Sequence, residues 1–180
     1  AEHKTDLKKM DFTVKKIGEH ASTQIFLPEF VQAVEKLSFY HAASRGSVYQ
    51  ALTPQSILEG ASLGAVQHLS EIKTESKRSH HTEVFQSDEE TRIAHYKMII
   101  REEFAKKQSV FILVPTAHEA VTLKALLEKG IEQYSYALHG TLTKKNTVHH
   151  WNSIIKEEHP VLVIATALFL SLPKLWSTII

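Results

Sequence analysis

The chain has 180 residues, of which 43% are hydrophobic and 23% are charged, and its formal net charge at pH 7 is +1. This composition is that of a globular protein, and the near-neutral charge excludes a global basic field that would attract nucleic acid. Because the chain has no cysteine, disulfides and thiolate metal sites are excluded. No secretory leader or bilayer-length apolar run is visible, so we expect a cytoplasmic protein.

The first part of the chain predicts a small α+β unit over residues 1–58. Residues 12–14 favour a short strand, and Pro28 is typical of the first turn of a helix. Residues 44–47 should end this helix, and residues 48–52 favour a second strand that a Thr-Pro pair stops. The buried face of the helix is expected to contain Phe30, Val34, Leu37 and Tyr40 with His41.

Residues 59–82 are weakly patterned and largely polar, which predicts a linker or mobile loop. Residues 83–180 alternate between apolar runs and amphipathic segments, which predicts an α/β unit with a parallel sheet and flanking helices. Val84 and Phe85 form a strand remnant at its start. Strands are predicted at 110–115, 134–138, 161–165 and 174–180, and helices at 91–107, at 117–129 with Val121, Leu123 and Leu127 buried, and after Thr143.

The strands of this second unit carry motifs in a recognisable order. They read ILVP at 112–115, LHG at 138–140 and VIATALF at 163–169, with Trp151 in the intervening helix. This ordered set resembles the helicase core of the primosomal protein N′ family, the PriA-type replication-restart helicases, which read LVPE, LHSGL and IGTRSALFAPL. The resemblance implies a partial RecA-like sheet and a role in replication restart. The chain starts without methionine and stops inside an apolar segment, so we expect a piece of a longer protein.

The N-terminal unit resembles the end of that family's domain for DNA 3′ ends. The matching pieces are LPE at 27–29, FYHAA at 39–43, RGSVY at 45–49 and LTP at 52–54. The resemblance implies that Tyr40, Arg45 and Tyr49 contact DNA, since aromatic rings stack on bases and a cation holds phosphate. The alternative is that Tyr40 and Tyr49 pack on each other in a small core. The family's winged-helix domain is missing between the two units.

The segment that should hold the nucleotide departs from the family. A phosphate-binding loop needs glycines and a lysine, whereas residues 86–92 read QSDEETR and the chain has no Gly-Lys pair. Gln86, Thr91 and Arg92 stand at the degenerate loop positions, and the three acids between them should repel phosphate. The alternative is that Ser87 or Asp88 caps the following helix. We therefore expect no ATP or magnesium in this chain, although the family uses both, and no catalytic residue.

Other candidate DNA contacts follow the strands. His139 and Thr141 flank a glycine turn, and Thr166 stands where the family has a Thr-Arg-Ser turn facing DNA. Lys144 and Lys145 begin a helix whose start can approach a phosphate backbone. The alternatives are a plain tight turn, an unliganded loop threonine and a solvated helix face. The adjacent histidine pairs lack the i, i+4 spacing of metal helices, so no metal is expected.

Three functions remain open from the sequence. The first is a divergent primosomal protein N′-like protein that binds forked or 3′-ended DNA with a degenerate nucleotide loop, together with other replication-restart proteins. The second is a full-length protein that is an active ATP-dependent 3′–5′ helicase, with Arg92 in place of the lysine. The third is an interaction module with no nucleic-acid role, which the near-neutral charge supports.

Overall fold

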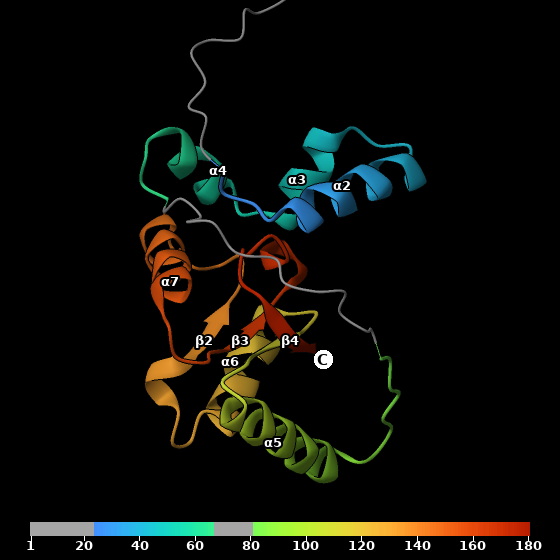
Figure 1. Cartoon of the computed structure of the whole chain (residues 1–180), viewed down its shortest axis with the longest axis vertical. Coiled ribbons are helices and arrows are strands. Elements are labelled where there is room, and N and C mark those ends of the chain that lie inside the picture. The colour runs from blue at the N-terminus through green and yellow to red at the C-terminus, as the bar shows by residue number, and fades with distance from the viewer. Residues whose placement is uncertain (1–23, 67–80) are drawn as a thin grey trace, which may run out of the picture.

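The computed structural model describes residues 24–66 and 81–180 and has an α/β fold (Figure 1). Its four-stranded parallel sheet has the order β2-β3-β1-β4, and helices cover both faces. The four predicted strands are confirmed, but residues 81–88 are extended coil, so no strand forms at Val84. The expected strand at 12–14 lies outside the described residues. The strands are β1 (Ser109–Leu113), β2 (Ser135–Leu138), β3 (Leu162–Ala165) and β4 (Trp176–Ile179).

One face of the sheet packs against α5 (Glu89–Ala105) and α6 (Ala117–Leu127). Alternate residues of β1 and β3 point to this face, among them Ile112 and Ile164, which are almost fully buried. The prediction that the face of α6 includes Val121 is wrong, since 52% of this side chain is exposed. Leu127 is buried as predicted, because positions 120, 123 and 127 recur every three to four residues and so lie on the same side of the helix.

The other face packs against α7 (Lys144–Lys156), which Thr143 caps as predicted by accepting a hydrogen bond from the Asn146 amide at 3.2 Å. Trp151 of α7 is completely buried, and it lies in one cluster with Phe111 and Val163 of the central strands. The central strands are therefore apolar on both faces, as the sequence predicted.

Helices are the only regular secondary structure in the described part of the N-terminal unit, and the predicted strand at 48–52 is wrong. The Ser44 hydroxyl accepts a hydrogen bond from the Ser47 amide at 3.1 Å and so caps a helix that includes those residues. This cap outweighs the β-propensity of the Val-Tyr pair. A further helix begins directly after Pro54 and extends into the predicted linker. The helices are α2 (Pro28–Tyr40), α3 (Arg45–Leu52) and α4 (Gln55–Ser62).

These helices join the core of the α/β unit. Ile25, Ile57 and Val66 are buried in the same cluster as Trp151, so the N-terminal segment covers the α7 side of the sheet. The contact is also polar, because the Asn152 amide donates to the Ala65 carbonyl at 2.9 Å. In Figure 1, α4 lies beside the start of α7, and α2 and α3 lie over the end of the sheet.

Helix α2 is buried only at Val34, because it packs mainly on α3. The prediction that Leu37, Tyr40 and His41 lie on its buried face is wrong, and Leu37 is 37% exposed. Tyr40, the last residue of the helix, is 81% exposed, and His41 is the exposed C-cap. No helix within residues 24–66 and 81–180 is long and apolar enough to cross a membrane.

A lysine fastens the end of α7 to the approach of β4. The Lys174 ammonium donates to the carbonyls of Ile154 at 3.0 Å and Glu157 at 2.8 Å, which lie where the helix ends and leaves carbonyls without helical partners. Burial lowers the pKa of Lys174 from its ordinary value. The segment that leads into β4 is thereby tied to the helix that precedes β3.

Candidate functional site

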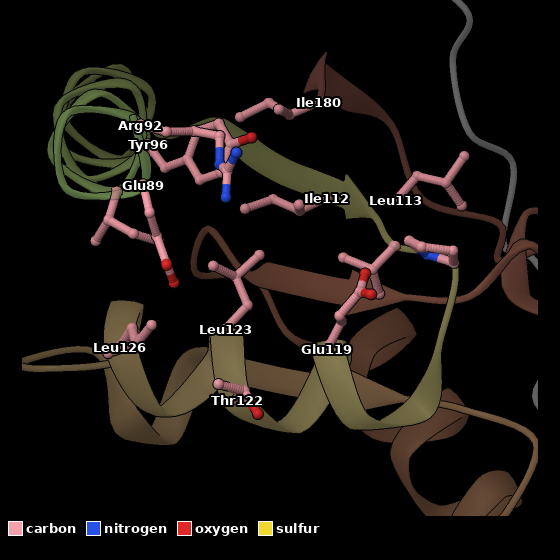
Figure 2. A pocket seen from close by; sticks show the side chains of 13 residues that line it. Glu89, Arg92, Tyr96, Ile112, Leu113, Glu119, Thr122, Leu123, Leu126 and Ile180 are labelled. Atoms are coloured by element: carbon pink, nitrogen blue, oxygen red, sulfur yellow. The ribbon is translucent and has the colours of Figure 1, made fainter. Parts of the chain in front are cut away.

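A pocket of about 440 Å³ opens at the carboxyl end of β1, between α5 and α6 (Figure 2). In open α/β sheets ligands bind beyond the carboxyl ends of the strands, so this is where a ligand is expected. Its floor is apolar and includes Ile112, Leu123 and Leu126. Its polar groups are Arg92, Glu89 and Tyr96 from α5, and Glu119 and Thr122 from α6.

The side-chain carboxylate of Asp88 caps the first turn of α5. Asp88 accepts hydrogen bonds from both the amide and the hydroxyl of Thr91, each at 2.9 Å. These hydrogen bonds hold the pKa of the Asp88 carboxyl below its ordinary value. The amide that a phosphate would use at a helix start is thus occupied, and the capping interpretation of this segment is confirmed.

Replacing Asp88 by alanine is expected to lower the thermal midpoint of unfolding by a few degrees, because α5 loses its cap. The folded pKa of this carboxyl is lowered, so its contribution is complete above the unfolded pKa and is lost as the pH falls through the folded value. The difference between wild type and Asp88→Ala should therefore shrink at acid pH, as measured by circular dichroism. Glu90→Ala, in the same turn, is the control, and an equal loss in both variants would contradict the capping role.

The three positions predicted for the degenerate nucleotide loop have different surroundings in the structure. Arg92 lines the pocket, whereas Thr91 is engaged with Asp88. Gln86 is exposed in the extended segment before α5 and is not among the lining residues. The neighbouring Phe85 is held against α5 by stacking on His95, with ring centroids 4.1 Å apart.

The loops after β2 and β3 meet at the carboxyl edge. The Thr166 amide donates to the Leu138 carbonyl at 3.1 Å, and the Thr141 hydroxyl lies 2.8 Å from His139 Nδ1. A side-chain carbon added at Gly140 would lie 3.6 Å from Leu168, so the two loops are in contact. Three predicted DNA-binding positions, His139, Thr141 and Thr166, are therefore brought together.

The two lysines at the start of α7 differ. Lys144 is paired with Glu59 of α4 at 3.1 Å, and this pair lowers the pKa of the glutamate. Lys145 is exposed. The Lys144–Glu59 pair is exposed to solvent and is therefore weak. Lys145 forms no ion pair with a described residue, so it is the unpaired cation at the start of α7.

The predicted aromatic set of the N-terminal unit is dispersed. Tyr49 is half-buried and stacks on Phe26 with centroids 5.3 Å apart, whereas Tyr40 contacts His41 and faces solvent. Arg45 forms an ion pair with Glu35 of α2. Tyr49 therefore packs among the N-terminal helices. It stacks on Phe26 and not on Tyr40, which the alternative interpretation had predicted as its partner.

The sequence did not identify the α6 wall of the pocket. Glu119 and Thr122 carry no motif, and only their position after a strand end signals them. Tyr96 of α5 is partly buried and also lines the pocket.

No group of three or more histidine and acidic side chains within the described ranges could hold a metal ion. Comparisons of the chain with family models, with curated proteins and with solved structures find no match.

Proposed function

We propose that the chain is part of a divergent primosomal protein N′-like protein that binds forked or 3′-ended DNA through a RecA-like domain with a degenerate nucleotide loop. The observation that carries the proposal is the meeting of the loops after β2 and β3, which groups His139, Thr141 and Thr166 at one edge. The parallel sheet with helices on both faces is consistent with a RecA-like arrangement.

The DNA contacts of the proposal are to the phosphate backbone. The Thr166 hydroxyl and the His139 imidazole offer hydrogen-bond donors to phosphate oxygens, whereas the Asn146 amide at the start of α7 is occupied by its Thr143 cap. Lys145 supplies the positive charge close to them. Such contacts read no base sequence, so the preference for a fork would have to come from the shape of the DNA.

The proposal includes the loss of nucleotide binding in the manner of the family. Its support is the Asp88 carboxylate at the start of α5, which occupies the place where a glycine-rich loop would turn its amides toward phosphate. A fluorescent ATP analogue is expected not to bind at micromolar concentration. Saturable binding would instead favour an active helicase, with Arg92 in the place of the lysine.

The DNA proposal is tested by titrating forked and blunt duplexes at increasing salt. We expect binding that falls steeply with salt. Lys145→Ala should reduce the slope of log K against log salt by about 0.9, because the variant neutralises one phosphate fewer and releases fewer counterions. Thr166→Ala should weaken binding at every salt concentration.

Lys129→Ala is the matched control, because Lys129 is an exposed lysine that follows α6 at the opposite end of the sheet. An equal effect of the Lys145 and Lys129 substitutions would contradict the assigned surface. Salt-independent or absent binding to both duplexes would contradict the DNA function itself. It would favour the third function, an interaction module with no nucleic-acid role.

A further inference from the structure

The pocket between α5 and α6 presents an arginine that the described part of the chain does not neutralise. No ion pair or hydrogen bond joins the Arg92 side chain to another described residue. Figure 2 shows this guanidinium directed from α5 into the space above Leu123. Arg92 is exposed, and an arginine above an apolar surface offers a planar fork of donors that matches a carboxylate in two parallel hydrogen bonds.

The other charges of the pocket disfavour a ligand that carries more than one negative charge. Glu89 and Glu119 line it together with Arg92, so the lining carries two negative charges and one positive charge. In Figure 2 the carboxylate of Glu119 points from α6 toward the end of β1, and that of Glu89 points toward Leu126. A dianionic phosphate would be repelled by both acids, whereas a monocarboxylate meets half of that repulsion.

The apolar lining of the pocket favours a ligand that also has an apolar part. Ile112, Leu123 and Leu126 form the floor, and Ile93 and Ile180 add further aliphatic surface. A volume of about 440 Å³ lies within the range of pockets that hold small molecules. A guanidinium is less strongly hydrated than an ammonium, so its burial under such a ligand costs comparatively little.

We propose that this pocket binds a small monocarboxylate with an apolar body, whose carboxylate pairs with Arg92 and whose hydrocarbon part lies on the floor between α5 and α6. This site is independent of the proposed DNA surface, because the loops of that surface follow β2 and β3 and contribute no lining residue.

The test is calorimetric titration of the full chain with octanoate, with octylamine and with octyl phosphate. We expect octanoate to bind more tightly than either relative. Arg92→Gln should weaken octanoate binding about tenfold, because the variant loses the positive charge that pairs with the carboxylate. Arg101→Gln is the control, since Arg101 is an exposed arginine of the same helix that does not line the pocket.

A second variant, Thr122→Trp, fills the pocket from a position on its α6 wall and should abolish octanoate binding without unfolding the chain. The proposal is overturned if octanoate binds equally to the two arginine variants, if octylamine or octyl phosphate binds more tightly, or if no heat of binding is found. DNA titrations of Arg92→Gln should match wild type, which separates failure of this site from failure of the DNA function.

Discussion

Replacing Trp151 by alanine is expected to lower the free energy of unfolding by about 3–5 kcal/mol, as measured by urea denaturation. The side chain is completely buried between α7 and the sheet, in the cluster that contains Phe111 and Val163. Its removal takes away the largest fully buried side chain of the described residues and leaves a cavity that packed strands cannot fill.

Trp151→Phe is the matched control for this change. The indole nitrogen is buried and has no hydrogen-bond partner among the described residues, so phenylalanine forfeits no hydrogen bond and leaves a smaller cavity. The phenylalanine variant should therefore lose less than half of what the alanine variant loses. Equal losses in the two variants would mean that the indole nitrogen does have a partner, such as a buried water molecule.

Replacing Ile57 by alanine is expected to cost about 2–5 kcal/mol of unfolding free energy, although Ile57 lies outside the α/β alternation. Its side chain is fully buried in the cluster that holds Trp151, so α4 and the sheet share one core. The loss should appear as a single shifted transition when the unfolding of helices, by circular dichroism, and the exposure of buried tryptophan, by fluorescence, are followed together.

Leu63→Ala is the control for Ile57, because this leucine follows α4 directly and is 83% exposed. It should change the free energy of unfolding by less than about 0.5 kcal/mol. An early separate transition for the N-terminal helices of Ile57→Ala, with the tryptophan signal unmoved, would show that the two parts unfold independently.

The strands and long helices of the α/β unit could be predicted because each has a strong apolar pattern. Phe111 and Ile112 belong to a run with no polar residue, which only a strand covered on both faces accommodates well. The error at residues 48–52 arose because one side-chain cap at Ser44 decides between helix and strand where the apolar pattern is short. Local capping chemistry carries more information there than β-propensity.

The candidate site was predictable only in part, for reasons of geometry. The sequence identified the loop around Asp88 and Arg92, because missing glycines are visible in a sequence. It did not identify Glu119 or Thr122, because these residues become neighbours of Arg92 only when α6 lies beside α5. The separation of Tyr40 from Tyr49 could not be predicted either, since it depends on which face of α2 is covered by α3.

The strand order also has a consequence for the growing polypeptide during synthesis. The central strand β1 pairs Val110 with Leu162 and Ser109 with Trp176, so both of its neighbours are made long after it. The ribosome must therefore release the whole stretch from β1 to β3 before β1 gains its first hydrogen-bonded partner. Until then its apolar side chains remain open to chaperones, and folding of this unit is delayed until translation has passed β3.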